Sequence, residues 1–460
     1  MIASHIIPKI VLASAMTTAL TSTLIFAETP EPEVGKRWVL NAEFSDEFNG
    51  NTLDKTKWRD HHSTWKGRAP GKFEPSAVSV SNGSMQIRNH KLAVPDGKYT
   101  IAAGAVQSIT KNAYHGYYEA RLKTSRINMS TTFWLSNGNE HLLSPNNVNA
   151  DCDDDKWSME LDIAEAVGGV IDKEWGKSFR NGQQYNVHVW YSDCSGNRKS
   201  FAKGANVAEG DGSKPVNNKL ANGEEVWQNF NTFAAWWKNE NDVQFYLNDN
   251  FSGKVKVSTA LHNKPYSRPM GIQMLTETYN WATPYPTEEE LLNNAINTSY
   301  YDWIRSYLYI GVNDVLDQVV TDPESINNGS TTLYTENFTI KNHVLTEDNL
   351  AVAFLYQINR DRDAEVVVFD GNNEVTRKKI TLKAGYGHYL TDIDLSIIGD
   401  LVNPVFEINL MAVGQIAILT STGKVVIAHS EPPAEIISTL SKDIMQTSYL
   451  KHLRANKVRI

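Results

Sequence analysis

The sequence predicts an all-β protein, in which a larger sandwich or jelly roll is followed by a smaller β-sandwich-like domain. Two observations on the chain support this fold class. Residues 37–310 consist largely of short β-type runs separated by Gly, Asn, Asp and Ser. A second group of such runs fills residues 346–430, which is about the size of a small sandwich domain. Many short strands with turn signals between them are typical of sandwiches and jelly rolls, and they disfavour an α/β fold.

The expected elements follow from local pattern. Strands of the larger unit are expected at 77–80, 85–88, 117–122, 131–135, 185–191 and 243–247. One helix is expected, because Thr287 and Glu290 form a capping box ahead of two leucines. Strands of the second unit are expected at 366–369, 379–382, 389–395, 405–410 and 416–419.

Composition divides the rest of the chain. Residues 1–27 are interpreted as a secretory signal peptide, because an apolar run with small residues precedes an acidic, proline-containing stretch. A membrane anchor is the alternative, and the many Ser and Thr residues of the run argue against it. We therefore expect a secreted protein whose larger unit spans 28–312. Residues 313–345 are polar and are predicted to be a linker or a covering segment. Residues 431–460 are expected to form a C-terminal tail, with an ordered helix and a disordered end as the alternatives.

Charge, motifs and cysteines limit the function classes. The formal net charge of -9 does not suggest a nucleic acid or an anionic membrane as partner. The chain contains no P-loop, dinucleotide fingerprint, HExxH motif or G-x-S-x-G elbow. The only cysteines are Cys152 and Cys194, and a secreted protein often pairs two cysteines. We expect a disulfide here, with two free thiols as the alternative and a zinc site poorly supported.

The segment with the most chemical information is 157–165, which reads WSMELDIAE. In a strand, Glu160 and Asp162 share one face and the apolar residues between and after them point into a core. One extra residue bulged out near Ile163 returns Glu165 to the face of the other two acids. A solvated edge strand and an amphipathic helix are the alternatives, but in a helix the three acids would not form one stripe.

Three carboxylates on one surface suit double-displacement cleavage of a glycoside. Such a reaction needs a nucleophile and an acid/base about 5–5.5 Å apart. Glu160 and Glu165 lie ~13 Å apart at the backbone of a strand, and two long side chains leaning together can close much of that gap. Asp162 between them can accept or share a proton. Neighbouring negative charge raises the pKa of one member, and the titration belongs to the group as a whole.

This acidic segment matches the E-x-D-x-x-E signature of glycoside hydrolase family 16. Further segments resemble that family in the same order along the chain, at 44–50, 116–121, 132–135 and 301–307. The resemblance covers about 37–310 and implies a jelly-roll sandwich of two curved antiparallel sheets with an open cleft. It also implies that Glu160 is the nucleophile, Glu165 the acid/base and Asp162 an assisting carboxylate. Retention of the anomeric configuration is implied, and no cofactor is needed for catalysis.

The resemblance further implies a structural calcium ion. Many family members bind one on the convex face, away from the cleft. Glu47, the carbonyl of Gly83 and Asp302 fall in the matching segments. Calcium takes six to eight oxygen ligands, often including backbone carbonyls.

The resemblance narrows the substrate to red-algal galactan. The segments 65–70, 233–238, 275–278 and 286–291 resemble β-agarases. An endo-hydrolase of β-1,4-galactosidic bonds in agarose is therefore the first expectation. A sulfated galactan such as porphyran, furcellaran or carrageenan is the alternative, with Arg68 or Arg126 as the cation that holds the sulfate.

Several side chains are candidates for substrate binding. Trp65, Trp134 and Trp281 offer flat apolar faces to sugar rings, with a core position as the alternative for each. Glu277 is placed as a hydrogen-bond partner of a sugar hydroxyl, and His188 as a neighbour of the nucleophile. A surface salt bridge and a core histidine are the respective alternatives.

Two other functions stay open at this level. A galactan-binding lectin on the same fold would need no catalysis, although all three carboxylates are present. Alternatively, residues 346–430 would be a binding or adhesion module. The expected partner is the galactan itself, with no nucleic acid, no membrane after signal cleavage, and a monomeric chain.

Overall fold

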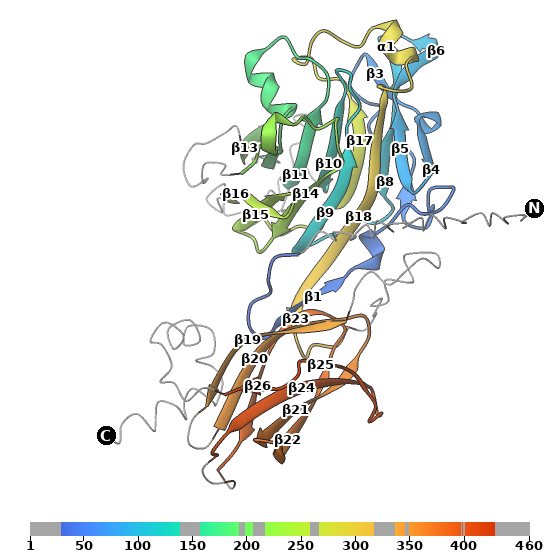
Figure 1. Cartoon of the computed structure of the whole chain (residues 1–460). Helices are drawn as coiled ribbons and strands as arrows, with labels where there is room; N and C mark the ends of the chain where they lie inside the picture. The colour runs from blue at the N-terminus through green and yellow to red at the C-terminus, as the bar shows by residue number, and fades with distance from the viewer. Residues whose placement is uncertain are drawn as a thin grey trace, which may run out of the picture.

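The computed structural model describes residues 29–138, 157–192, 198–205, 217–257, 266–316, 336–345, 349–396, 398 and 401–427. They form two β-rich units, with β1 and β18 reaching from the larger unit to the smaller one (Figure 1). The all-β class is confirmed. The expected signal peptide, Cys152, Cys194 and the tail at 431–460 lie outside the described residues. No helix in the described part of the chain is long and apolar enough to cross a membrane.

The larger unit packs two antiparallel sheets face to face. One sheet, called here the site sheet, has the order β13-β12-β11-β10-β17-β8-β2. Its strands are β2 (Trp58–Arg59), β8 (Ala105–Ser108), β10 (Ser130–Ser136), β11 (Trp157–Val167), β12 (Gln184–Ser192), β13 (Arg198–Gly204) and β17 (Gly271–Glu277).

The opposite sheet, called here the outer sheet, runs β16-β15-β14-β9-β18-β1 in this unit, with β5 and β4 beside β18. Its strands are β1 (Lys36–Leu40), β4 (Val78–Ser81), β5 (Ser84–Arg88), β9 (Gly116–Lys123), β14 (Asn231–Trp237), β15 (Asp242–Leu247), β16 (Asn250–Lys256) and β18 (Thr298–Gly311). A small third sheet joins β3 (Gly71–Phe73), β6 (His90–Asp96) and β7 (Tyr99–Ala103).

The main core of the larger unit combines apolar side chains from both sheets. Phe133, Leu161 and Ile163 of the site sheet join Phe245 and Ile304 of the outer sheet in one buried cluster. The expected inward orientation of Leu161 and Ile163 is confirmed. Burying each large side chain contributes about 1.5–3 kcal/mol, so this core holds the site sheet in a fixed position.

The helices are short. The expected helix is confirmed as α1 (Glu288–Leu292), and its capping box is present: Thr287 and Glu290 each satisfy a backbone N–H of the other. The other helices in the described residues are short 3₁₀-helices, which are η1 (Ala42–Phe44), η2 (Pro75–Ala77), η3 (Glu174–Phe179) and η4 (Ala221–Gly223).

The smaller unit is a second sandwich. One layer contains β19 (Asn337–Leu345), β20 (Asn349–Ile358) and β23 (Gly385–Asp394). The other contains β21 (Arg362–Asp370), β22 (Asn373–Leu382), β24 (Pro404–Ala412), β25 (Ile418–Ser421) and β26 (Val425–Val426). β19 lies inside the segment that was expected to be a linker, and it pairs with β20 along its length. In the described residues, the smaller unit therefore already includes residues before 346.

One strand belongs to both units. β1 pairs with β18 on one side and with β23 on the other, so the outer sheet continues into the smaller unit. The buried guanidinium of Arg37 donates to the carbonyl oxygen of Ala384 at 2.5 Å and to that of Asp314 at 2.7 Å. The two units are therefore joined by backbone pairing as well as by the chain between them.

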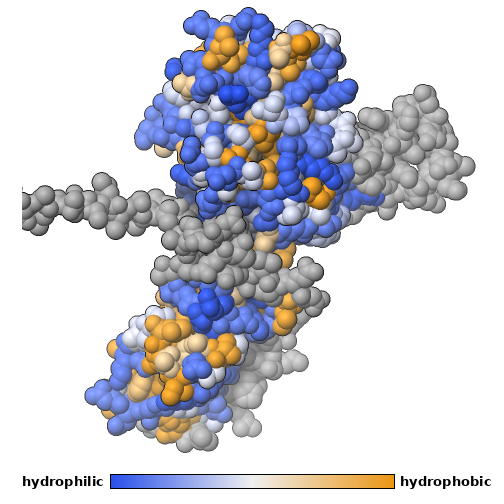
Figure 2. All heavy atoms as spheres, turned by 90° about the vertical axis from the view of Figure 1, so that its right-hand side faces the viewer, coloured by the Kyte–Doolittle hydropathy of each residue, from blue (hydrophilic) through white to orange (hydrophobic). Residues whose placement is uncertain are grey.

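The smaller unit also exposes apolar side chains. Figure 2 shows apolar side chains gathered on one of its faces. The strongly exposed apolar residues of this unit are Val402, Val413, Ile416, Ile418, Leu419 and Val426. They come from β25, β26 and the loops around β24, and not from the strands that pair with the larger unit.

Candidate active site

The three acids of β11 face one way because the strand contains a bulge. Phe133 of β10 pairs with Ala164, but the next residue, Trp134, pairs with Asp162, so Ile163 is the extra residue. The pairing with β12 shifts over the same stretch. The predicted bulge is confirmed, and it restores Glu165 to the face of the other acids.

This face of the site sheet lines a cavity of about 280 Å³. Every residue proposed from the sequence as catalytic or substrate-binding contributes to its wall, except Arg126. The lining residues are Trp65, Arg68, Thr132, Trp134, Glu160, Asp162, Glu165, His188, Glu277, Tyr279 and Trp281. The structure thus brings together residues that are more than 200 positions apart in the chain, and their roles in binding stay predictions.

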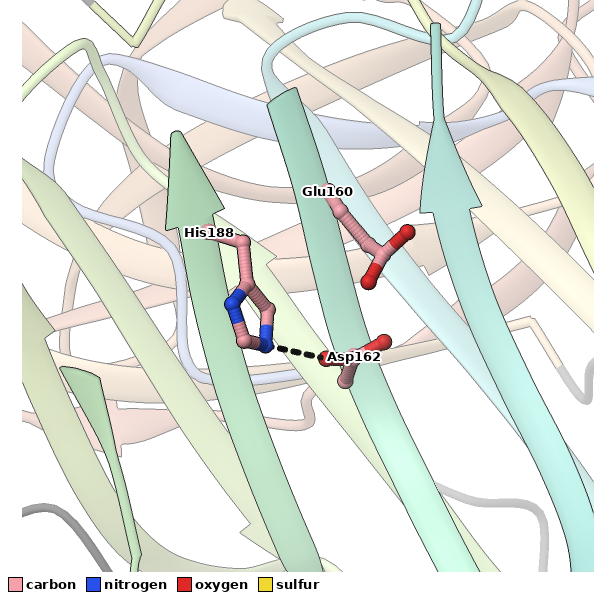
Figure 3. Close-up of side chains that lie close together, drawn as sticks. All are labelled: Glu160, Asp162 and His188. Carbon is pink, nitrogen blue, oxygen red and sulfur yellow. Dashed lines mark ion pairs between the residues drawn. The ribbon is translucent and has the colours of Figure 1, made fainter. Parts of the chain in front are cut away.

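Asp162 lies between the two glutamates and contacts a histidine of the next strand. His188 of β12 is paired in register with Glu160, and its Nε2 lies 3.2 Å from Oδ2 of Asp162 (Figure 3). The imidazole is held in place by Trp190, whose ring is parallel to it with centroids 5.0 Å apart. His188 is therefore positioned to orient the central carboxylate.

Two of these carboxylates and the histidine lie close enough together to ligate one metal ion. Glu160, Asp162 and His188 each offer a ligand atom, and these atoms lie within 4.8 Å of one another. Imidazole and carboxylate together suit several divalent cations. Among the described residues this is the group that could hold a metal ion, and the double-displacement chemistry of carboxylates needs none.

Burial and neighbouring negative charge raise the pKa values of Glu160 and Asp162. Burial raises the pKa of Glu160 well above its ordinary value, the charge of Asp162 raises it further, and His188 opposes both. Burial also raises the pKa of Asp162, with Glu165 adding to the effect. The cluster therefore retains a proton to higher pH than exposed carboxyl groups would, and that proton belongs to the group as a whole.

Glu165 is the acid with a dedicated hydrogen-bond donor. Burial raises the pKa of Glu165, and the hydroxyl of Tyr279 opposes this by donating to its Oε1 at 2.7 Å. The positive charge of Arg68 opposes it as well. Glu165 can thus be protonated before the reaction and still be stabilised as a carboxylate after it, as an acid/base must be.

A second ion pair borders the cavity. Nε of Arg68 donates to Oε2 of Glu277 at 2.8 Å, and the side chain of Glu277 is only 7% exposed. Burial raises the pKa of Glu277 to about 7, against the opposing charge of Arg68. Arg68 is also within 6 Å of the ring centroids of Trp65 and Tyr279. Glu277 is thus engaged by Arg68, as the salt-bridge alternative proposed, and the bridge lies at the cavity.

The three tryptophans are half-buried, each with its back against other aromatic or apolar groups. Trp65 meets Phe73 edge to face at 5.0 Å, and Trp134 packs against the same apolar cluster. Trp281 stacks on Tyr279 with centroids 4.8 Å apart. A flat ring that is fixed from behind and open in front is suited to stacking against a sugar.

Three residues of the site were not anticipated: Thr132, which lines the cavity, Tyr279 and Tyr266. Tyr279 lies two positions after Glu277, so a period-2 extension of that strand would have placed both side chains on one face. Tyr266 donates its hydroxyl to the backbone carbonyl oxygen of Glu160 at 2.6 Å. No local sequence pattern predicts that contact, because it joins residues that are 106 positions apart.

Arg126 does not line the cavity. Its guanidinium lies over the ring of Trp227 at 4.3 Å, and its backbone N–H donates to the carbonyl oxygen of Ile296. Of the two arginines considered for a sulfate, Arg68 is the one at the cavity.

The residues expected to bind calcium do not fit that ion. Both carboxylate oxygens of Glu47 accept from Arg305, at 2.7 and 2.9 Å, in a buried bidentate pair. Asp302 is paired with Arg121. A calcium ion at these carboxylates would have to displace two guanidinium groups, so the expected site at Glu47, Gly83 and Asp302 has no support in this geometry.

Comparison with known proteins agrees with this geometry. Residues 38–309 match the family described as "Beta-porphyranase A-D, GH16 domain", and residues 337–399 match the "Porphyranase-associated domain". Beta-porphyranase D of Zobellia galactanivorans is 36% identical over 372 residues, which cover 78% of this chain and 81% of that protein.

A solved structure and a more distant relative complete the comparison. The crystal structure of a beta-porphyranase from the human gut bacterium Bacteroides plebeius superposes with a TM-score of 0.54 at 34% identity, covering 62% of this chain and 96% of that chain. The extracellular agarase of Streptomyces coelicolor is 24% identical over 311 residues, covering 64% of this chain and 93% of that protein. The comparisons therefore favour the sulfated-galactan alternative over the first expectation of a β-agarase. The chain belongs to the beta-porphyranase branch of glycoside hydrolase family 16 and is a glycoside hydrolase of red-algal galactan.

Proposed function

We propose that this protein is a retaining endo-hydrolase of β-1,4-galactosidic bonds in porphyran. The observation that carries the mechanism is the placement of Glu160, Asp162 and Glu165 on one face of a bulged strand, inside one cavity. The substrate is supported by the porphyranases among its relatives and by Arg68 at the cavity.

In the first step a carboxylate oxygen of Glu160 attacks the anomeric carbon of the sugar on the non-reducing side of the bond. The bond from that carbon to the glycosidic oxygen breaks, and Glu165 transfers its proton to the departing oxygen. The product is a covalent galactosyl ester of Glu160 and a free chain end. The raised pKa of Glu165 keeps this proton bound to a higher pH than in an exposed glutamate.

In the second step Glu165, now ionised, takes a proton from a water molecule. The water oxygen attacks the anomeric carbon, and the carboxylate of Glu160 leaves. Two inversions at one carbon give net retention. The hydroxyl of Tyr279 stabilises the ionised form of Glu165 that exists between the two steps.

Asp162 and His188 serve the nucleophile. A proton on Asp162, whose pKa burial raises, removes a like charge from the neighbourhood of Glu160 and lets that glutamate ionise. The imidazole of His188, 3.2 Å from Oδ2 of Asp162, fixes the orientation of this carboxyl group. Asp162 and His188 thus favour the negative charge on the Glu160 carboxylate, which is the group that attacks the sugar.

Arg68 supplies the positive charge that a sulfated sugar needs. Among the residues described as lining the cavity, it is the permanently cationic one. Its side chain is 47% exposed although Nε is bonded to Glu277, so part of the guanidinium faces the open cleft. A guanidinium fork binds sulfate oxygens through directed, charge-assisted hydrogen bonds.

Export of the protein is also part of this proposal, because a polymeric substrate would be encountered outside the cell.

The test is product analysis on purified polysaccharides. The protein is incubated with porphyran, agarose, furcellaran, κ-carrageenan and lichenan, and the first products are examined by NMR for their anomeric form. Sulfated oligosaccharides from porphyran, released as the β-anomer, are expected. Glu160→Gln should lower kcat by roughly 10⁴-fold or more, as loss of a covalent nucleophile does in other enzymes.

The control is the same chemical change on the exposed surface. Glu288→Gln alters a carboxylate of α1 that pairs with Lys91 in solvent, and its kcat should equal that of the wild type. Cleavage of agarose but not porphyran would move the substrate assignment to agarose. A Glu160→Gln variant with undiminished activity would overturn the mechanism.

A further inference from the structure

A row of aromatic rings leads from the catalytic acid to the protein surface. Tyr279 donates its hydroxyl to Glu165 and stacks its ring on Trp281, with the ring planes 17° apart. Trp281 in turn contacts Trp175, with ring centroids 4.7 Å apart. Exposure rises along the row: Tyr279 is 5% exposed, Trp281 half-buried, and Trp175 53% exposed. Trp175 lies beyond the cavity-lining residues, so the row continues past the catalytic cavity.

Two rim segments, 168–180 and 278–284, carry these rings and are joined by partly buried hydrogen bonds. The side-chain amide of Asn128 donates to the carbonyl oxygen of Val170 at 2.5 Å and to that of Pro284 at 2.7 Å. The backbone N–H of Asp172 donates to the carbonyl oxygen of Thr283 at 2.9 Å. The two segments are thereby fixed to each other at the end of the site sheet that holds Glu165.

Close packing holds Trp175 in its place on η3. A Cβ atom at Gly169 would lie 2.1 Å from Oδ1 of Asn128, and one at Gly176 would lie 2.7 Å from Cγ2 of Ile171. Phe179, which is 7% exposed, supports both Trp175 and Trp281 from η3. A ring that is already ordered loses little conformational entropy when a ligand covers it.

We propose that Trp175 forms a further sugar-stacking subsite, which lengthens the cleft beyond the cavity at its Glu165 end. The occupant is the same galactan chain that is cleaved, and the inference therefore rests on the proposed function. Single exposed aromatic residues are common on protein surfaces. Trp175 differs because its ring continues an ordered row that starts at a catalytic carboxylate. Nζ of Lys173 lies 5.9 Å from the Trp175 ring centroid, which adds a cation suited to a sulfated sugar.

The experiment measures kcat/KM on porphyran and agarose oligosaccharides of increasing length for the wild type, Trp175→Ala and Trp175→Phe. Trp175→Ala should lower kcat/KM on the longest oligosaccharides on the order of tenfold, the effect of losing about 55 Å² of apolar contact. The loss should be smallest on the shortest substrate that is cleaved, because that substrate does not reach η3. Trp175→Phe should restore most of the activity, since it keeps a flat ring.

The matched control is Phe251→Ala, which removes an aromatic ring that is 37% exposed on β16 of the outer sheet. It should leave the length dependence as in the wild type. Equal losses with Trp175→Ala at every length, or no loss at any length, would overturn the subsite. Failure of the wild type on porphyran with cleavage of agarose would refute the proposed substrate only, because the agarose series still tests Trp175.

Discussion

Glu277 is expected to control the net charge that a sulfated sugar meets beside Arg68. The raised pKa of about 7 places its ionisation in the physiological range. Below that pH the carboxyl group is neutral and the charge of Arg68 is uncompensated. Above it the pair Arg68–Glu277 is neutral overall. Binding of a sulfated oligosaccharide should therefore weaken as the pH rises through about 7.

The magnitude follows from the geometry of the pair. A sulfate held by the open side of Arg68 would lie about 7 Å from the Glu277 carboxylate, beyond the 2.8 Å hydrogen bond. Because the Arg68 side chain is 47% exposed, solvent screens the interaction, and an effective dielectric constant of about 20–40 applies. One unit of negative charge then weakens binding by about 1–2 kcal/mol, or roughly 5- to 30-fold in Kd.

The assay is calorimetric titration of an inactive protein with intact ligand. Kd for a porphyran oligosaccharide is measured with Glu160→Gln from about 1.5 pH units below to about 1.5 units above that pKa. The double variant Glu160→Gln/Glu277→Gln carries no ionisable group at position 277. Its Kd should rise less with pH, because position 277 no longer gains a negative charge. Some dependence on pH should remain, because the carboxyl groups of Asp162 and Glu165 are present in both proteins.

A neutral agarose oligosaccharide of equal length is the ligand control, and its Kd should respond less to pH in the Glu160→Gln protein. If the double variant loses affinity with pH as steeply as Glu160→Gln alone, the electrostatic role of Glu277 is refuted. That role is also refuted if the Kd of the neutral oligosaccharide rises with pH as much as the Kd of the sulfated one.

Two further predictions concern buried polar contacts. Tyr279→Phe removes the donor to Glu165, which raises the pKa of that carboxyl group further. The first step needs Glu165 protonated, so the alkaline limb of kcat/KM against pH should move to higher pH. Arg305→Met leaves the buried Glu47 carboxylate unpaired. It should lower the free energy of unfolding by about 3–5 kcal/mol, measured as a fall in Tm of roughly 6–20 °C.

Each of these has a matched control. Tyr266→Phe removes a buried hydroxyl that contacts a backbone carbonyl oxygen, and its alkaline limb should stay in place. An equal displacement in both tyrosine variants would contradict the role assigned to Tyr279. Lys91→Met breaks the exposed pair with Glu288 and should cost less than about 1 kcal/mol. If Lys91→Met lowers the free energy of unfolding as much as Arg305→Met does, burial does not explain the stabilising effect of the Arg305–Glu47 pair.

Local rules were enough to predict the catalytic strand. Side-chain alternation placed Glu160 and Asp162 on one face, and the parity of Glu165 required the bulge that the pairing of β10 and β11 contains. The capping box at Thr287 could be predicted for the same reason, since both of its hydrogen bonds join residues three positions apart. Such features depend on backbone geometry over a few residues, which the order of side chains expresses directly.

The partners of charged side chains could not be predicted in this way. Glu47 was assigned to calcium on a family resemblance, whereas the fold brings Arg305 against it from 258 residues away. The smaller unit was expected to be connected to the larger one only through a linker, yet β1 pairs directly with its strand β23, with Arg37 opposite Gly387.

The fold class, the bulged acidic strand and the aromatic and cationic candidates around it could be predicted from the order of residues, because local patterns and short motifs encode them. The family followed from the resemblance of several such motifs in the same order. Only the tertiary structure decided which distant groups meet: Tyr279 on Glu165, Arg68 on Glu277, and Trp175 at the end of an aromatic row. Those contacts arise from the packing of separate segments against a common core. The amino-acid sequence of any one segment therefore does not predict them.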